Sequence, residues 1–235
     1  MKEIIAMHGW AGNGDQWANW KNLFQHANWE WQTAERGYKK ENSYMPTWNI
    51  QSNQANQKKV AICHSLGLHI IDKKVLSSAT HVVLINSFSR FIPSGKDKRY
   101  ILMALKKMLN AINTPNEAVM LRKFHIKAYK PNNINMASTE PNLAYLSDSG
   151  RLRLKNDLKI LINSDSLPIG LSSNAKVLII NSEKDHILGD QTKDRLSEDL
   201  ISHLVSLPKI INLQEEGHSI SKIMSIKKIK HWLES

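Results

Sequence analysis

The sequence contains only one cysteine, Cys63, in 235 residues. A single thiol excludes an internal disulfide framework, and such low cysteine usage is typical of the reducing cytoplasm. No apolar run approaches the roughly 20 residues that a membrane-spanning helix requires. The apolar stretch near the N-terminus is interrupted at His8-Gly9, so it is too short for a signal peptide. These absences predict a soluble cytoplasmic protein with no membrane span.

Acidic residues are also scarce, because 21 Asp and Glu stand against 32 Lys and Arg, which gives a formal net charge of +11. Residues 95–165 hold 13 Lys and Arg but only 6 Asp and Glu, whereas the charges of residues 166–235 balance. A positive surface attracts acidic proteins, lipid headgroups or nucleic acid, or it is simply a solvated face. No nucleic-acid-binding motif accompanies the charge, so we do not expect nucleic acid as a partner.

Short runs rich in Val and Ile predict buried strands. They lack strict polar alternation, which favours a parallel sheet covered on both faces. Helical patterns fall between the runs, and this alternation predicts an α/β fold with a doubly wound sheet. The predicted strands are Ile4–Met7, Val60–Cys63, His81–Ile85, Lys176–Ile180 and Ile210–Leu213, with a possible sixth at Trp29–Thr33. The predicted helices of this layered part are Leu66–Ser77, Thr192–Leu207 and Ile220–Glu234.

Residues 95–165 interrupt this alternation with helical patterns alone. We expect helices at Tyr100–Ile112 and Glu117–Lys127, a link at Lys130–Asn135, and a further helical stretch at Asn142–Ile162. Helices inserted between two strands of an open sheet often form a lid over the strand ends, where ligands bind. We therefore expect a core made of residues 1–94 and 166–235 and an inserted helical lid at 95–165.

Cys63-His64-Ser65-Leu66-Gly67 lies between a predicted strand and a predicted helix. A sharp strand-turn-helix of this kind is the setting of a nucleophile elbow, in which the serine hydroxyl is exposed at the top of the sheet. The turn requires small neighbours, and Gly67 is one of them. The backbone amide of Leu66, at the helix N-terminus, is placed to bind an oxyanion.

A serine hydroxyl is a poor nucleophile unless a base takes its proton. Asp185 follows the fourth main predicted strand and His218 follows the fifth, so Ser65, Asp185 and His218 occur in the chain order of a hydrolase triad. Asp190 is a rival acid, although its position favours the start of the next helix. His186 is a rival base that we interpret as a loop residue.

The first predicted strand is followed by a glycine-rich loop, His8-Gly9-Trp10-Ala11-Gly12. A loop at this place points a backbone N–H into the site, and the Trp10 amide is the natural second oxyanion donor beside Leu66. His64 and His69 flank the elbow without a nearby cluster of acidic or Cys ligands, so we expect no metal. No organic cofactor is expected either.

With these motifs, the sequence resembles the α/β-hydrolase family over nearly its whole length. The motifs H-G-W-A-G, H-S-L-G, D-H-I and G-H-S carry the match, and H-G-W with Trp17 looks most like the pimeloyl-[acyl-carrier-protein] methyl ester carboxylesterases of biotin synthesis. The resemblance implies Ser65 as nucleophile, Asp185 and His218 as its partners, and the Trp10 and Leu66 amides as oxyanion donors. The usual elbow is G-x-S-x-G, but Cys63 stands at the first glycine position, where we expect a slightly adjusted turn.

The resemblance also suggests a partner for the basic insertion. Acyl carrier proteins are strongly acidic, and Arg122, Lys123, Arg151 and Arg153 are candidates for docking one at the lid. We expect a monomeric serine carboxylesterase that cleaves a methyl ester on a carrier-bound acyl chain. A thioesterase, a small-molecule esterase, a C–C hydrolase or a catalytically silent binding protein of the same fold are the alternatives. Cys63 as nucleophile is disfavoured, because it precedes the turn and points into the core.

Overall fold

The chain is built on one sheet of six parallel strands. The computed structural model describes residues 2–39, 42–49, 57–132 and 146–235. The strand order is β2-β1-β3-β4-β5-β6, and every neighbouring pair is parallel. The prediction of a parallel sheet is confirmed, including the possible sixth strand at Trp29–Thr33. The strands are β1 (Lys2–Met7), β2 (Glu30–Ala34), β3 (Lys58–His64), β4 (His81–Ile85), β5 (Lys176–Ser182) and β6 (Lys209–Leu213).

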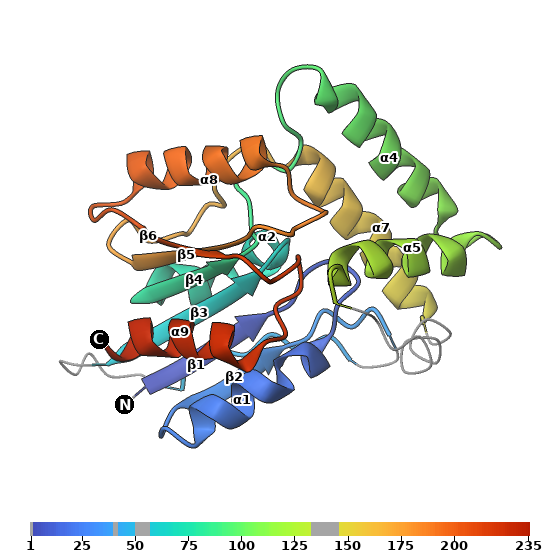
Figure 1. The fold of residues 1–235 in the computed structure, drawn as a ribbon. Coiled ribbons are helices and arrows are strands. Elements are labelled where there is room, and N and C mark those ends of the chain that lie inside the picture. Colours follow the sequence, from blue (N-terminus) through green and yellow to red (C-terminus); the bar gives the residue numbers. More distant parts are fainter. Residues whose placement is uncertain (1, 40–41, 50–56, 133–145) are drawn as a thin grey trace.

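Alternate residues of each strand pack into two separate hydrophobic layers. Ile5 and Cys63 belong to one layer, and Ile4 and Ile62 to the other. Because helices cover both faces, the strands need no polar face, which explains their Val and Ile content. In Figure 1, α8 lies on one side of the sheet and α1 and α9 lie on the other. The first layer includes α2 (Gly67–Ile70), α3 (Lys73–Ser78) and α8 (Asp190–His203), and the second includes the 3₁₀ helix η1 (Gly14–Trp17), α1 (Ala18–Gln25) and α9 (Ile223–Glu234).

Two short helices replace the single helix predicted over Leu66–Ser77. Helix α2 ends at Ile70, and the next two residues, Ile71 and Asp72, are extended, with ψ of 151° and 134°. The Asp72 side chain accepts a hydrogen bond of 2.6 Å from the Lys74 amide and caps the start of α3. The prediction of one continuous helix is therefore wrong, because this cap starts a new helix although the apolar spacing runs across it.

Three helices between β4 and β5 lie at the carboxyl ends of the strands (Figure 1). They agree with the predicted helices at Tyr100–Ile112 and Glu117–Lys127 and with the second part of Asn142–Ile162. Positions 133–145, which include the end of the predicted link and the start of Asn142–Ile162, lie outside the described residues. No helix in the described ranges is both long and apolar enough to cross a bilayer. The three helices are α4 (Asp97–Ala111), α5 (Glu117–Tyr129) and α7 (Asp148–Asn163).

A buried carboxylate ties α7 to the segment that follows β2. Asp157 on α7 is fully buried, and the Arg36 guanidinium donates to it from Nε at 2.7 Å and from Nη2 at 2.6 Å. The Tyr38 hydroxyl donates a further hydrogen bond of 2.6 Å. Arg153 of the same helix donates to the Gly37 carbonyl at 2.7 Å. A buried charge is tolerated only when it is paired and hydrogen-bonded, so this cluster fixes the position of α7 on the sheet.

We expect the substitution Asp157→Ala to lower the free energy of unfolding by about 3–5 kcal/mol, because it leaves the Arg36 guanidinium without its counter-charge. Urea denaturation of the two proteins measures the difference. Asp148→Ala is the matched control, since Asp148 lies in the first turn of the same helix with a fully exposed side chain. Asp148→Ala should shift the midpoint of the urea unfolding transition far less than Asp157→Ala. Equal shifts for the two variants would contradict the prediction.

Candidate active site

Ser65 occupies a strained turn between β3 and α2. Its φ is +54°, a left-handed conformation that non-glycine residues rarely adopt, and its residue surface is 7% exposed. The Ser65 amide donates to the Ile85 carbonyl at 2.9 Å, and the Ser87 hydroxyl donates to the Ser65 carbonyl at 2.7 Å. The backbone of the turn is therefore held by the end of β4. This is the geometry of a nucleophile elbow.

Two glycines allow the elbow to approach the end of β1. A Cβ on Gly67 would lie 2.7 Å from the Met7 carbonyl oxygen, and a Cβ on Gly9 would lie 2.9 Å from the Ser65 Cβ. Neighbouring atoms at such distances leave no room for a side chain at either glycine. The sequence predicted that the turn needs a small residue at position 67, and the close contact at Gly67 agrees with this. Gly9 is a second position at which only glycine fits.

Cys63 fits the first glycine position of the motif because its side chain faces away from the turn. It is fully buried in the hydrophobic layer that contains α2 and α3. Burial raises the pKa of its thiol well above the ordinary value. A thiol that stays protonated inside the core is a poor nucleophile, so the expectation that Cys63 points into the core agrees with the structure.

His218 and Asp185 form a buried pair at the carboxyl edge of the sheet. His218 Nδ1 lies 2.8 Å from Asp185 Oδ2, and the two side chains are 2% and 0% exposed. Asp185 Oδ1 also accepts hydrogen bonds from the amides of Ile187 at 2.7 Å and Leu188 at 3.1 Å. Burial alone would raise the pKa of Asp185, but His218 and the two amides outweigh it and lower the pKa. The carboxylate is therefore charged at neutral pH and orients the imidazole.

The carbonyl group of His218 is anchored by two donors. Asn86 Nδ2 donates to it at 2.7 Å, and His64 Nε2 donates to it at 2.9 Å. Asn86 also donates to the Ser182 hydroxyl at 2.9 Å and accepts from the Ser182 amide at 2.8 Å. The rings of His64 and His218 lie with centroids 5.0 Å apart. These contacts bring His218 beside the elbow, because His64 directly precedes Ser65.

Asn86 was not identified from the sequence as part of this site. It is fully buried, it follows β4, and its φ is +43°. One feature of the sequence could have identified Asn86. It is a polar residue directly after a predicted buried strand, at the sheet edge where Ser65 and Asp185 also lie. Asn is among the residues that tolerate a left-handed backbone.

The two amides expected to bind an oxyanion are unused elsewhere. No turn, loop or cap hydrogen bond in the described part of the chain has Trp10 N or Leu66 N as its donor. The Trp10 indole donates to the Leu154 carbonyl at 3.0 Å and so joins this loop to α7. His8 Nδ1 lies 2.8 Å from the Gly9 carbonyl oxygen, and the Arg36 amide donates to His8 Nε2 at 3.1 Å. The loop is therefore fixed at both its start and its middle.

The rival residues lie away from this arrangement. Asp190 is the first residue of α8, and its side chain is exposed at 3.7 Å from Lys193 Nζ. His186 is exposed on the loop after β5. Among the described residues, no group of three or more His, Cys, Asp or Glu is arranged to hold a metal ion. Asp185 and His218 are the residues that the structure brings together.

The four docking candidates differ in their surroundings. Arg151 Nε lies 3.0 Å from the carboxylate of Glu117, and Arg153 binds the Gly37 carbonyl. Arg151 therefore ties α7 to α5, and Arg153 ties α7 to the segment after β2. Arg122 and Lys123 are exposed on α5.

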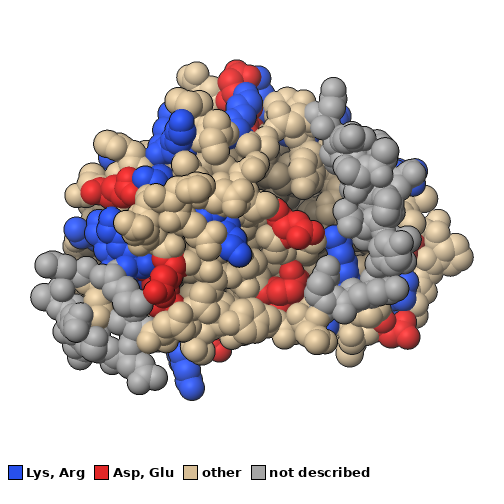
Figure 2. All heavy atoms as spheres, turned by 90° about the horizontal axis from the view of Figure 1, so that it is seen from below, with Lys and Arg blue, Asp and Glu red and all other residues tan. Residues whose placement is uncertain are grey.

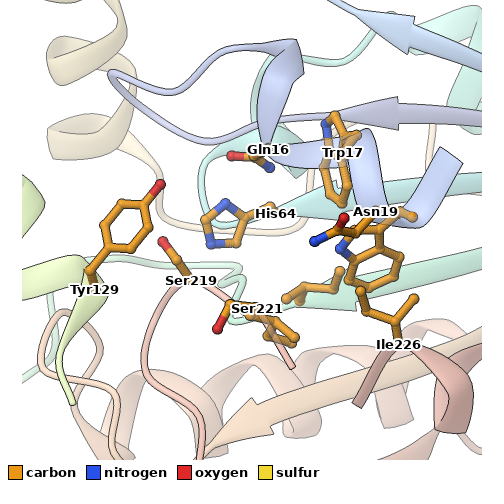
Figure 3. Close-up of a pocket in the computed structure, with 11 residues that line it drawn as sticks. Gln16, Trp17, Asn19, His64, Tyr129, Ser219, Ser221 and Ile226 are labelled. Carbon is orange, nitrogen blue, oxygen red and sulfur yellow. The ribbon is translucent and has the colours of Figure 1, made fainter. Parts of the chain in front are cut away.

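Helix α5 also contacts the loop that carries His218. The Ser219 amide donates to the Ala128 carbonyl at 3.1 Å, and a Cβ on Gly217 would overlap the Lys130 carbonyl oxygen. The end of α5 therefore packs directly on the segment beside the imidazole. Figure 3 shows Tyr129 and Ser219 on the same side of His64.

No family model and no curated protein matches this sequence. Solved structures do match it over nearly the whole chain. An esterase from Exiguobacterium antarcticum has 15% identity and a TM-score of 0.70, covering 100% of this chain and 92% of that one. A hydrolase from Oleispira antarctica has 12% identity and a TM-score of 0.71, with coverage of 100% and 92%. BioG from Haemophilus influenzae has 13% identity and a TM-score of 0.54, with coverage of 99% and 94%.

These similarities agree with the parallel, helix-covered sheet described above. The chain has the α/β-hydrolase fold, as the sequence predicted.

We expect Asn86→Gly to slow the reaction of Ser65 with a fluorophosphonate by about 10²-fold, because small displacements of an activating imidazole are costly. Glycine accepts the left-handed backbone, so this variant removes the side-chain anchor without adding strain. Labelling rates measured by mass spectrometry across a range of pH test the effect. Asn113→Gly is the control, because Asn113 also has a positive φ, 66°, but lies at the end of α4. Equal labelling of both variants would contradict a positioning role for Asn86.

Proposed function

We propose that this protein is a serine carboxylesterase. The observation that carries the proposal is the left-handed Ser65 beside a buried imidazole–carboxylate pair, with His218 Nδ1 at 2.8 Å from Asp185. The ring of His64, which directly precedes Ser65, lies 5.0 Å from the His218 ring, centroid to centroid, so the imidazole lies near the serine that it would activate. In this proposal Ser65 is the nucleophile, His218 the general base and Asp185 the residue that fixes the tautomer of the imidazole.

The acylation step uses the groups in a definite order. Ser65 Oγ attacks the ester carbonyl while His218 Nε2 takes the hydroxyl proton. The resulting oxyanion accepts hydrogen bonds from the Trp10 and Leu66 amides, and each such donor is worth about 10²–10³-fold in rate. The tetrahedral intermediate then collapses, the C–O bond of the ester breaks, and the leaving alcohol takes the proton from His218.

Deacylation repeats the same chemistry with water. His218 removes a proton from the water as it attacks the acyl-Ser65 carbonyl, and the proton passes to Ser65 Oγ when the acid leaves. Asp185, which is ionised at neutral pH, stabilises the transient imidazolium by its charge. No metal or organic cofactor enters either step.

The substrate we propose is a pimeloyl-[acyl-carrier-protein] methyl ester, cleaved in the cytoplasm by a monomeric enzyme. The motifs around Trp10, Ser65 and His218 support this choice, and the similarity of the fold to BioG from Haemophilus influenzae is consistent with it. The basic lid segment, proposed as a separate unit at 95–165, supplies a positive surface for an acidic carrier protein. Lys123 and Arg122 on α5 are the exposed members of the proposed docking set.

We expect Ser65→Ala to reduce kcat for a short-chain p-nitrophenyl ester by at least about 10⁴-fold, because the residual rate then comes from binding and the oxyanion hole alone. Ser77→Ala is the control, since Ser77 is an exposed serine on α3. The control should keep the full rate. Absence of turnover in the wild type as well would favour a silent binding protein over an enzyme.

The wild-type protein and Ser65→Ala also distinguish the hydrolysis of esters from that of thioesters and C–C bonds. Methyl esters, thioesters and C–C substrates of equal chain length are compared with the wild-type protein, and the methyl ester should give the highest kcat/KM. Rescue of a biotin auxotroph that lacks its own pimeloyl ester hydrolase tests the proposed substrate in the cell. Rescue by wild type but not by Ser65→Ala is the expected result.

We expect the double variant Lys123→Glu, Lys127→Glu to lower kcat/KM for a carrier-bound ester by about tenfold at low salt, with kcat for a free ester unchanged. Both lysines are exposed and lie one turn apart on α5. The difference should shrink in high salt, because the Debye length falls from about 10 Å at 0.1 M to about 3 Å at 1 M.

Lys227→Glu with Lys228→Glu provides the matched control for charge. These two exposed lysines lie on α9, which covers the sheet face opposite to α8 (Figure 1). Figure 2 shows Lys and Arg interspersed with Asp and Glu on the face seen from below. An equal loss of kcat/KM in both double variants would mean that net charge alone matters, and docking at α5 would then be wrong.

A further inference from the structure

Glu216 is a buried carboxylate that lies two residues before His218. It is 1% exposed, and no ion pair in the described part of the chain includes it. Its Oε1 accepts a hydrogen bond of 2.9 Å from the Lys222 amide, and its Oε2 accepts one of 3.3 Å from the Ser221 amide. A buried carboxylate needs hydrogen-bond donors or a cation, and here backbone amides are the donors.

The two amides lie at the start of α9. Lys222 directly precedes the first helical residue, and its side chain makes no cap for the helix. The first amides of a helix lack partners within it, and the N-terminus of a helix favours a negative charge. The Glu216 carboxylate therefore takes the place of a cap, from six positions earlier in the chain. This contact closes residues 216–222 into a loop that contains His218.

Apolar packing does not hold this end of α9. Positions 221–224 are all exposed, and the first buried side chain of the helix is that of Ser225. Figure 3 shows Ser221 on the segment that leads into α9. A helix end without a cap leaves its first amides unsatisfied and frays. The Glu216 carboxylate is thus the group that fixes where α9 begins.

The backbone of Glu216 is tied to the loop that carries the acid. Its carbonyl accepts a hydrogen bond of 3.2 Å from the Lys184 amide, and Lys184 directly precedes Asp185. His218 Nδ1 in turn lies 2.8 Å from Asp185 Oδ2. Glu216 therefore contacts both sides of the buried pair, with its main chain toward the acid loop and its side chain toward α9.

The other contacts of the loop fix single peptide groups. Asn86 and His64 bond the His218 carbonyl, and the Ser219 amide donates to the Ala128 carbonyl. The chain after Ser219 then depends on the place where α9 starts. If the first turn of α9 frays, the segment that is free to move begins directly beside the imidazole.

We propose that Glu216 is a positioning residue for the imidazole of His218. The inference rests on the proposed esterase function and adds a residue to it. Glu216 exchanges no proton with the substrate, since its carboxylate is bonded to the two amides at the start of α9. It acts through the loop, by keeping His218 Nε2 in line with the Ser65 hydroxyl. A displacement of about 1 Å in such an arrangement costs about 10²-fold in rate.

The kinetic test uses Glu216→Ala with a p-nitrophenyl ester. We expect kcat to fall about 10²-fold with KM unchanged, because the variant alters the direction of the base and not the binding of the substrate. Glu216→Gln keeps an oxygen that can accept from the Lys222 amide, so it should stay within about tenfold of the wild type. Glu215→Ala is the matched control, because the Glu215 carboxylate is 64% exposed at the neighbouring position. Equal kcat values for Glu216→Ala and Glu215→Ala would overturn the proposal.

A second control separates positioning from stability. Ile229 is fully buried on α9, and Ile229→Val destabilises the packing of that helix without touching the His218 loop. Urea denaturation measures the stability of both variants. Ile229→Val should keep the wild-type kcat, whereas Glu216→Ala should not. If kcat falls in both variants in proportion to the lost stability, Glu216 has a structural role only and the proposal is wrong.

A double-variant comparison tests whether Glu216 acts through His218. In the His218→Ala background the imidazole is absent, so adding Glu216→Ala should leave the slow fluorophosphonate labelling of Ser65 unchanged. Glu216→Ala alone should slow the labelling about 10²-fold. The same additional loss in both backgrounds would mean that the substitution distorts the elbow itself, which contradicts a role through the imidazole.

Proton NMR on a Ser65→Ala background provides a readout that needs no activity. We expect Glu216→Ala to speed the exchange with water of the proton between His218 Nδ1 and Asp185 by about tenfold or more, and Glu215→Ala to leave it unchanged. If the wild type hydrolyses esters but neither kcat nor this exchange responds to Glu216→Ala, the positioning role is overturned while the esterase function stands. If the wild type hydrolyses no ester and Ser65 is not labelled, the proposed function fails, and the exchange rate alone decides whether Glu216 holds the imidazole.

Discussion

The conformation of Ser65 is the constraint on which the rest of the site depends. A left-handed non-glycine residue costs about 1–3 kcal/mol, and the fold must hold it there. Ile85 and Ser87, at the end of β4, bond the Ser65 amide and carbonyl, and two such hydrogen bonds contribute about 1 kcal/mol each. The bonds therefore offset a strain of the same size. A relaxed turn would move the Leu66 amide together with the hydroxyl, so both depend on β4.

The same strand edge also positions the imidazole. Asn86, which follows β4, bonds the His218 carbonyl and the Ser182 amide, and Ser182 ends the strand that leads to Asp185. The three residues of the proposed triad are thus related through the end of one central strand rather than through their own loops alone. This arrangement explains why segments more than 100 residues apart in the chain keep a common geometry.

Much of this architecture could be predicted from local patterns, and the remainder depends on contacts that no local pattern encodes. Runs such as Val82–Ile85 are buried on both faces, so their composition alone indicates a strand. Asp72 was missed as a helix start because apolar spacing continues across it. The Arg36–Asp157 pair joins residues 121 positions apart. Counting charges in the sequence could not separate Arg153, which bonds the Gly37 carbonyl, from the exposed Lys123.

Electrostatic interactions differ in strength between the basic surface and the buried candidate site. In the proposed reaction the basic surface would act on encounter, where salt screens it, whereas the proposed triad would act in a low-dielectric interior. Two positive rings with centroids 5.0 Å apart would repel by about 3 kcal/mol at an effective dielectric constant of about 20, a factor of about 10² in the protonation equilibrium. Because burial keeps His64 neutral, its Nε2 can hold the His218 carbonyl without opposing the proton that His218 would accept in the proposed reaction. A lysine or arginine at position 64 would supply the same hydrogen bond to the carbonyl but would place a permanent charge beside the base.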